Sequence, residues 1–200
     1  MARFRRQTPQ RSATASDDEL VALAQRGDRD AFGVLYERYL PGVYGYCHRL
    51  LGEREVAEDA NTEVFMRALA ALPAYRPGSF RSWLFAIAHN VTADVLRQRH
   101  RTIPMAQAPE PIDPTTFEDT AMRAADWVRI ERALPSLSPD QQQVIALRLA
   151  GLTAVEIGAA MGRPRNAIDG LQHRALLRLK SLVATGEAAV SNDQGGGYGG

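Results

Sequence analysis

Apolar residues recur every three or four positions along most of the chain, which is the spacing of one face of an amphipathic helix. Gly27, Gly52 and Pro73 separate successive apolar stripes. The stripes of the first half are Leu20, Leu23, Ala24, Phe32, Leu35 and Tyr36, then Val43, Tyr46 and Leu50, then Val56, Ala60, Val64, Met66 and Leu69. No segment alternates apolar and polar residues as a strand does, so the pattern predicts an all-α protein.

Further helices follow this first group. One is predicted from Ser79 to a basic end at Arg101, with Trp83, Leu84, Ile87, Ala88, Val91, Val95 and Leu96 as its apolar positions. Capping sequences start helices at Ser16-x-x-Glu19, Ser138-x-x-Gln141 and Thr153-x-x-Glu156. Gly162-Arg163-Pro164 then predicts a tight turn before a last helix, whose inward positions are Ile168, Leu171, Ala175, Leu176 and Leu179.

Composition divides the chain into two small helical domains. Residues 102–126 hold Pro104, Pro109, Pro111 and Pro114 among acidic and small residues, a composition typical of a flexible linker. We therefore expect domains at 17–101 and 127–184, joined by a linker long enough to let them bind distant points of a larger partner. Residues 1–16 form a basic tail and residues 185–200 a glycine-rich tail, both expected to be disordered.

Charge and chemistry narrow the function classes. Lys and Arg number 24 against 23 Asp and Glu, so any basic surface must come from uneven distribution. The single cysteine, Cys47, allows no internal disulfide, which fits a cytoplasmic protein, and neither a membrane-spanning run nor a secretory signal is present. His48, His89, His100 and His173 are too scattered for metal-ligand spacing, and no glycine-rich phosphate loop occurs. We expect no enzyme, no metal, no cofactor and no small-molecule substrate.

The C-terminal domain carries the sharpest motif. A short helix, a glycine turn and a helix with a polar face are typical of a helix-turn-helix, although a generic three-helix bundle is the alternative. In a helix-turn-helix the last helix enters the major groove, where Asn and Gln suit adenine and Arg suits guanine or phosphate. The residues expected to face DNA are Arg163, Arg165, Asn166, Asp169, Gln172, His173 and Arg174.

The order and spacing of several segments resemble the extracytoplasmic-function (ECF) sigma factors of the sigma-70 family. Segments similar to sigma region 2 are Ala31–Tyr36, Ala57–Asp59, Glu63–Ala68, Tyr75–Leu84, Ile87–Asn90 and Asp94–Arg97. Leu134–Val144 and the helix-turn-helix resemble sigma region 4. The resemblance implies a factor that binds core RNA polymerase and directs promoter-specific transcription initiation, with region 2 at 17–101 and region 4 at 127–184.

The resemblance also implies where each partner binds. The beta-prime clamp coiled coil of the polymerase would bind the surface formed by Glu58, Asp59, Asn61, Thr62, Glu63 and Met66, and region 4 would meet the beta flap. Read without the family, the same residues could be an ordinary solvated helix face. Minus-ten DNA would be opened and read by the loop Tyr75–Phe80 and the helix after it, through Arg76, Arg81, His89, Asn90, Arg97, Arg99 and Arg101. Trp83 is either a core residue or a platform on which an unpaired base stacks.

One part of the chain departs from the family pattern. Asp169 and Leu171 stand where relatives usually carry Lys or Arg, and Gly170 stands at a hydroxyl position. An acidic group repels phosphate and a mid-helix glycine weakens a helix, so minus-thirty-five recognition is expected to be weak or unusual. Two other readings stay open: a free-standing helix-turn-helix regulator that dimerises on DNA, and a degenerate sigma-like interaction protein. An anti-sigma factor is a possible further partner that the sequence does not identify.

Overall fold

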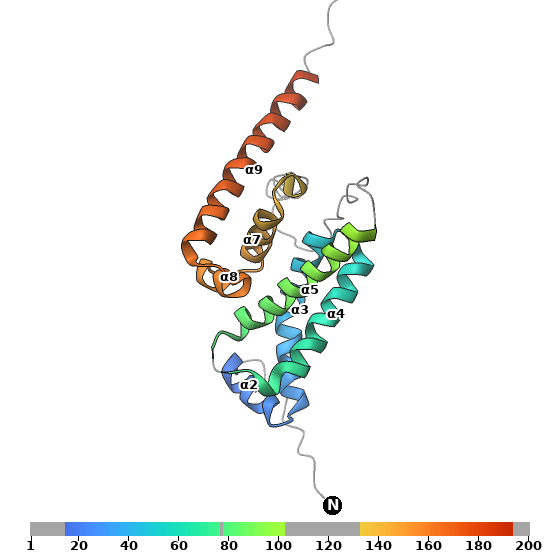
Figure 1. Cartoon of the computed structure of the whole chain (residues 1–200), viewed down its shortest axis with the longest axis vertical. Coiled ribbons are helices and arrows are strands. Elements are labelled where there is room, and N and C mark those ends of the chain that lie inside the picture. Colours follow the sequence, from blue (N-terminus) through green and yellow to red (C-terminus); the bar gives the residue numbers. More distant parts are fainter. Residues whose placement is uncertain (1–14, 77, 103–132, 194–200) are drawn as a thin grey trace, which may run out of the picture.

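A computed structural model of the chain describes residues 15–76, 78–102 and 133–193, and throughout these ranges the regular structure is helical, with no strand (Figure 1). The first module contains α2 (Asp17–Gln25), α3 (Arg29–Leu51), α4 (Arg54–Ala71), the short 3₁₀ helix η1 (Leu72–Ala74) and α5 (Phe80–Thr102). The second contains the 3₁₀ helix η2 (Leu134–Ser136), α7 (Pro139–Leu149), α8 (Ala154–Met161) and α9 (Arg165–Asp193). The all-α prediction is confirmed.

The helices begin where the capping sequences predict. The side chains of Ser16, Ser138 and Thr153 each accept a hydrogen bond from the backbone amide three residues on. In turn, the side-chain oxygens of Glu19, Gln141 and Glu156 accept a hydrogen bond from the backbone amide of the capping residue. Gly52 and Gly162 end α3 and α8 with positive φ angles of 77° and 64°, which glycine adopts without strain. These local signals fix the helix limits before any packing occurs.

The first module is a bundle in which α3, α4 and α5 pack on one another and α2 lies across one end (Figure 1). Its core includes Leu35, Val64 and Phe85, and the buried Tyr46 hydroxyl lies 3.5 Å from Thr92 Oγ1. Arg38 and Tyr39 of α3 both bind Asp17 and so attach α2 to the bundle.

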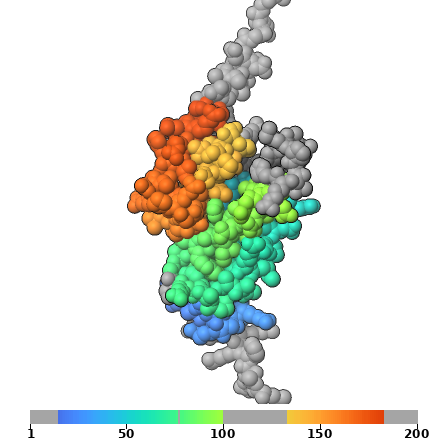
Figure 2. Space-filling model, viewed as in Figure 1, coloured from blue at the N-terminus to red at the C-terminus, as the bar shows by residue number. Residues whose placement is uncertain are grey.

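The second module packs directly against the first. It has a small core of its own, formed by Ala133, Leu134, Leu137, Ile145, Ala175 and Leu179. Its remaining apolar residues, among them Leu147, Leu152 and Ile157, belong to the same buried cluster as the residues of the first module. Helix α8 lies against α5 and α7 against α3, and the space-filling view shows the two modules in continuous contact (Figure 2). The sequence predicted two domains and not this shared core.

Other details also differ from the sequence expectations. Leu176 was assigned to the inward face of the last helix, but its side chain is exposed, whereas Ile168, Leu171, Ala175 and Leu179 of α9 are buried. Helix α9 also continues to Asp193, into the predicted tail. Glu187, Ala188 and Ala189 are strong helix formers, and the glycine run starts only at Gly195.

Two further predictions concern segments that lie mostly outside the residues that the structure describes. The predicted linker at 102–126 and the basic tail at 1–16 fall mostly outside the described ranges, as do residues 194–200. Within the described ranges, no helix is both long enough and apolar enough to pass through a lipid bilayer.

Candidate functional site

Helix α4 presents a mixed acidic and apolar face. Glu58, Asp59, Thr62, Glu63 and Met66, which the family resemblance assigned to a docking surface, are all exposed. Met66 is 61% exposed and Leu69, one turn further along, is 48% exposed, although both belonged to a predicted core stripe. Exposed apolar groups of this size on one helix face are typical of a protein-binding surface. Leu69 is a surface residue that the periodicity alone did not identify.

Asn61 does not share this face, contrary to the sequence prediction. It is 6% exposed, and its Oδ1 atom is buried without a hydrogen-bond partner among the described residues. Asn61 lies one position from the exposed row of α4, and a step of one residue turns a side chain about 100° around a helix. Its side chain therefore cannot contact a partner that docks on the other residues.

The carboxylates of α4 differ in how they are paired. Glu58 binds Arg54 at 2.8 Å and Glu63 binds Arg67 at 2.7 Å, both along the helix. Within the described ranges, no ion pair is recorded for the Asp59 carboxylate, so a basic group of a partner can bind it without displacing an internal cation.

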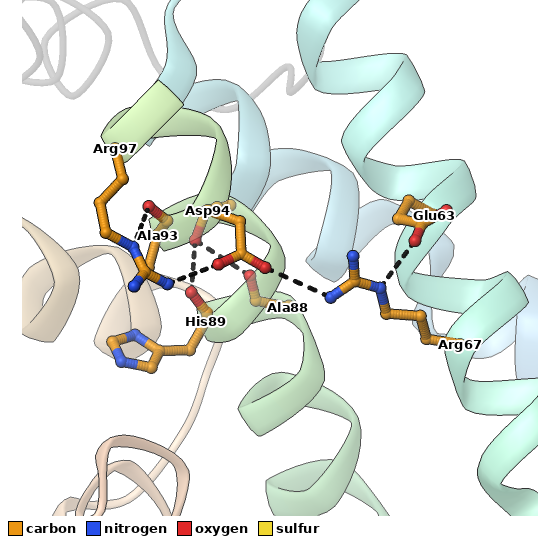
Figure 3. A network of polar contacts seen from close by, with 8 residues as sticks. Glu63, Arg67, Ala88, His89, Ala93, Asp94 and Arg97 are labelled. Atoms are coloured by element: carbon orange, nitrogen blue, oxygen red, sulfur yellow. Dashed lines mark hydrogen bonds and ion pairs between the residues drawn. The ribbon is translucent and has the colours of Figure 1, made fainter. Parts of the chain in front are cut away.

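A network of alternating charges connects α4 to α5 (Figure 3). Arg67 bridges Glu63 and Asp94, with 3.4 Å between its Nη1 and the Asp94 Oδ2, and Asp94 in turn binds Arg97. Arg97 Nε also donates to the Ala93 carbonyl at 3.3 Å. The network therefore joins a residue predicted to bind polymerase, Glu63, to one predicted to bind DNA, Arg97. Asp94 was quoted only for its family resemblance, and neither it nor Arg67 was predicted to have this role.

Three aromatic side chains cluster where α5 begins. Trp83 is half-buried, with its ring centroid 4.9 Å from that of Tyr75 and 5.5 Å from that of Phe80. The Tyr75 hydroxyl donates to the Gly78 carbonyl at 2.8 Å, and Gln25 donates to the Leu72 and Tyr75 carbonyls at 3.0 and 2.9 Å. These bonds fix the loop before α5. Trp83 packs on two rings and keeps part of its surface accessible, so the structure is compatible with both roles that the sequence left open.

The residues predicted to contact minus-ten DNA occupy different environments. Arg76 and Asn90 are exposed. Arg99 donates to the Leu51 carbonyl at 2.8 Å and binds Glu53 at 3.0 Å, so it neutralises the C-terminal end of α3. The side chain of Arg101 lies outside the described part of the chain.

Arg81 and His89 lie at the contact with the second module. Arg81 Nη1 donates to the Gly151 carbonyl at 3.1 Å. His89 is half-buried, and its Nδ1 atom is buried without a described hydrogen-bond partner. Burial lowers the pKa of His89, the nearby Arg163 lowers it further, and Asp140 opposes them.

The helix-turn-helix is formed by α8, the turn at Gly162 and α9. Gly158 allows the turn to close, because a Cβ atom at this position would lie 2.7 Å from the Arg163 carbonyl oxygen. The Arg163 amide donates to the Gly158 carbonyl at 2.9 Å. Sequence analysis did not identify Gly158, since a glycine inside a short helix gives no sign of what its missing side chain would touch.

The polar residues of this motif are available on the surface. Arg165, Asn166, Asp169, His173 and Arg174 are exposed and Gln172 is half-buried. Arg163 forms an ion pair with Asp140 at 2.7 Å, whereas Arg165 lies 3.6 Å from Asp169. Asn166 Oδ1 accepts a bond from the Ala167 amide at 2.9 Å. The first turns of α9 thus present several base-reading side chain types together.

These features define a class of protein: two helical modules, one with an exposed acidic and apolar helix face and the other with a helix-turn-helix whose last helix exposes polar residues. Family models give the class its name, since the model for sigma-70 region 2 matches residues 35–102 and that for sigma-70 region 4 matches residues 133–181.

Known proteins agree with this assignment. The chain is 36% identical over 183 residues to the ECF RNA polymerase sigma factor SigD of Mycobacterium bovis, covering 86% of each chain. It is 34% identical over 172 residues to the ECF sigma factor BldN of Streptomyces coelicolor, covering 82% of this chain but only 65% of BldN. The structure of CnrH in complex with the cytosolic domain of CnrY matches with a TM-score of 0.66 and 25% identity, over 84% of this chain and 97% of that one.

The chain belongs to the ECF sigma factors of the sigma-70 family. It is a transcription initiation factor and not an enzyme: a sigma factor binds core RNA polymerase and gives it promoter specificity.

Proposed function

We propose that the exposed row of α4 is the surface that docks on the beta-prime clamp coiled coil of core polymerase. The row comprises Glu58, Asp59, Thr62, Glu63, Met66 and, as an addition to the sequence prediction, Leu69. A rim of carboxylates around large exposed apolar groups supports this, because such a surface suits a partner helix that combines basic and apolar residues. The second module would meet the beta flap.

Promoter contacts are proposed on two separate surfaces. Arg76 adjoins Tyr75 in the aromatic cluster of Tyr75, Phe80 and Trp83, and Asn90 and Arg97 offer exposed polar groups further along α5. Aromatic rings and basic side chains together are the combination that holds and stacks single-stranded DNA. Arg165, Asn166, Gln172, His173 and Arg174 would read the upstream element from α9. Arg99 is proposed to act mainly through the end of α3, since both its contacts are within the protein.

Regulation and location follow from the same assignment. The structural relative CnrH was solved with the cytosolic domain of CnrY, which supports the proposal that a protein partner also binds this chain as an anti-sigma factor. Core polymerase and the chromosome share the bacterial cytoplasm, and we place the function of this chain there.

The single observation that carries the proposal is the presence, in one chain, of the exposed α4 row and the exposed start of α9. The test is transcription in vitro with core polymerase over a library of promoters, with and without this protein. A new, sequence-dependent set of transcripts is expected only when both are present. Sequence-specific DNA binding by the free chain, without such transcripts, would instead support a free-standing regulator. Tight polymerase binding without any transcript would support a degenerate sigma-like interaction protein.

The α4 assignment has its own test. Asp59→Lys should weaken binding to core polymerase about tenfold, because it reverses an unpaired charge at the proposed contact. Glu37→Lys makes the same kind of charge change at an exposed position of α3 and should leave the affinity unchanged. Titration of labelled polymerase, with circular dichroism to confirm helix content, compares the two variants. Equal affinities would assign the clamp contact to another surface.

A further inference from the structure

The outer face of α9 has a gap at Gly170. Residues four positions apart are neighbours on a helix surface, so Gly170 lies between Asn166 and Arg174, and the side chains of both are exposed. The sequence identified Gly170 only as a weak point of the helix and a departure from the family pattern. We call the space left by its missing side chain the Gly170 gap.

The guanidinium of Arg174 occupies the Gly170 gap. A Cβ atom built on Gly170 would lie 3.4 Å from Arg174 Nη1 and 4.0 Å from Arg174 Nη2. Long side chains on a helix point back toward its N-terminus, which carries the guanidinium from position 174 over position 170. The charged end of Arg174 therefore lies close to the backbone of α9, on the face expected to meet DNA.

A similar arrangement occurs in another helix of the chain. In α3, a Cβ atom built on Gly45 would lie 3.1 Å from Arg49 Nη1, so here too a glycine makes room for the guanidinium four residues later. Gly45 and Arg49 are both half-buried in the first module, far along the sequence from α9. The spacing of glycine and arginine, and not one particular neighbour, therefore accounts for the arrangement.

Space, and not an ion pair, determines where the Arg174 guanidinium lies. Among the residues that the structure describes, no ion pair is recorded for Arg174. By contrast, Arg163 binds Asp140 at 2.7 Å, and Arg165 lies 3.6 Å from Asp169. Of these three arginines, Arg174 can therefore bind DNA without first giving up an internal carboxylate.

The direction of an arginine side chain decides what it recognises on DNA. A guanidinium reads guanine through two hydrogen bonds to O6 and N7, which require a fixed direction. A guanidinium that contacts phosphate adds affinity but carries no sequence information directly. The Gly170 gap places the Arg174 guanidinium toward the N-terminal turns of α9, the part of a recognition helix that contacts base edges.

We infer that Gly170 is a positioning residue that sets base specificity. It leaves room for the Arg174 guanidinium on the outer face of α9, where that group reads a guanine of the upstream element. The inference rests on the proposed function of α9 and adds to it a residue that has no side chain to contact a base. A larger side chain at this position fills the gap and moves the guanidinium toward phosphate, so specificity falls while the charge facing DNA is kept.

A branched side chain in the gap tests the inference. Gly170→Val adds two methyl groups beyond Cβ, and valine has a higher helix propensity than glycine, so α9 is not weakened. The probe is duplex DNA with a fixed minus-ten region and a randomised upstream region, bound by the holoenzyme and then sequenced. The wild type should prefer guanine at one upstream position at least fivefold. Gly170→Val should reduce this preference to less than twofold and leave the salt slope of binding unchanged.

Two further variants separate the gap from other effects. Gly170→Ala is the matched control, because its Cβ at 3.4 Å from Arg174 Nη1 is at ordinary contact distance, so it should keep the preference. Arg174→Lys keeps the charge but cannot form the paired hydrogen bonds, so it should lose the preference at the same base pair. The double variant Gly170→Val/Arg174→Lys should lose no more than either single variant, because both changes remove one interaction.

Each outcome of this experiment decides a point. A full preference for guanine in Gly170→Val would overturn the inference, and so would an equal loss in Gly170→Ala. If Arg174→Lys affects no upstream base pair, or a different one from Gly170→Val, the gap does not direct Arg174. If the wild-type holoenzyme shows no upstream preference at all, the proposed function of α9 is itself wrong, and the inference is wrong with it.

Discussion

At the scale of single residues, the burial of Asn61 differs from what its position in the sequence suggested. Asn61 was predicted to bind polymerase because of its position in a family segment, but its side chain is buried. Its unpaired Oδ1 means that the protein has removed a polar group from water without replacing the lost hydrogen bond, which costs stability. The residue therefore marks a local weakness of α4 and not a contact surface.

Replacement of Asn61 should therefore stabilise the protein. Asn61→Leu has nearly the same shape and no polar group to desolvate, so we expect the free energy of unfolding to rise by about 1 kcal/mol. Urea unfolding followed by circular dichroism measures this free energy, and titration with core polymerase measures the affinity of the same variant. Lower polymerase affinity with unchanged stability would return Asn61 to the contact surface.

Asp169 also has a neighbour that modifies its expected effect. The sequence suggested simple repulsion between this acid and DNA phosphate. In the structure its carboxylate lies 3.6 Å from the Arg165 guanidinium, so it also competes with DNA for a side chain proposed to read bases. Both groups are more than half exposed, and such pairs are weak in water.

Substitution of Asp169 should strengthen upstream DNA binding in two steps. Asp169→Asn releases Arg165 and removes the repulsion, and Asp169→Lys adds a phosphate contact that increases the magnitude of the log-log salt slope by about 0.9. The gain should be similar across promoter sequences, because phosphate contacts carry little base information. Holoenzyme binding at several salt concentrations measures both effects. An identical salt slope for wild type and Asp169→Lys would mean that this part of α9 does not approach the backbone.

At the scale of elements, two glycines of the helix-turn-helix look alike in sequence and differ in structure. Gly158 lies in α8, where a Cβ would lie 2.7 Å from a backbone carbonyl of the turn. Gly170 lies in α9, where a Cβ would meet only the Arg174 Nη1 atom at 3.4 Å, the mobile end of an exposed side chain. Backbone cannot move aside as a side chain end can.

Alanine at these two positions should therefore have opposite effects. Gly158→Ala should destabilise the second module by about 1 to 3 kcal/mol through overpacking, whereas Gly170→Ala should stabilise α9 by up to about 1 kcal/mol through helix propensity. Thermal or urea unfolding of the full chain compares the variants. Stabilisation by Gly158→Ala would contradict the close approach of the turn to α8.

At the scale of the whole molecule, the packing of the second module on the first, α8 on α5 and α7 on α3, should depend on pH through His89. Burial is the main cause that lowers the pKa of His89, the Arg163 guanidinium lowers it further, and the Asp140 carboxylate acts in the opposite direction. Because the pKa of His89 is lower when the two modules are packed together than when they are apart, the packed form binds fewer protons than the separated form. Its stability is therefore complete above the ordinary histidine pKa of about 6.5 and falls as the pH drops below that value.

Dyes attached through Arg26→Cys and Arg178→Cys, both exposed positions, report the distance between the two modules by energy transfer. The expected result is a loss of energy transfer as the pH falls from 7.5 to 5.5. His89→Gln should flatten this dependence, since it removes the titrating group from the contact. The matched control is His173→Gln, because His173 is exposed on α9 and should leave the dependence in place. Flattening by His173→Gln instead would locate the titrating group outside the contact between the modules.

The sequence by itself determined the helical fold, the starts of three helices and the family. Ser16, Ser138 and Thr153 with their partners act within four residues, and Gly52 and Gly162 end helices through their own backbone freedom, so these signals need no tertiary context. Helical spacing also placed Glu58, Asp59 and Glu63 on the outer face of α4 and the polar residues on the outer face of α9, because it fixes which side chains share a face. The rest of the α4 surface came from the family resemblance, and Leu69 was assigned to the apolar stripe. Exceptions such as Asn61 and Leu176 arose where the width of a buried face depends on what packs against it.

Only the tertiary structure decided how the modules meet. Ser79 and Glu156 are 77 positions apart and Arg81 and Gly151 are 70 positions apart, and no periodicity within either segment indicates that they touch. The pairing of Arg67 with Asp94 likewise depends on α4 and α5 lying side by side, whereas the pairs Arg67–Glu63 and Arg97–Asp94 each lie within one helix. Local sequence specifies backbone conformation through short-range hydrogen bonds, whereas contacts between distant segments depend on the three-dimensional fit of whole surfaces. That fit decided that Arg81 and His89, both predicted to bind DNA, lie against the second module.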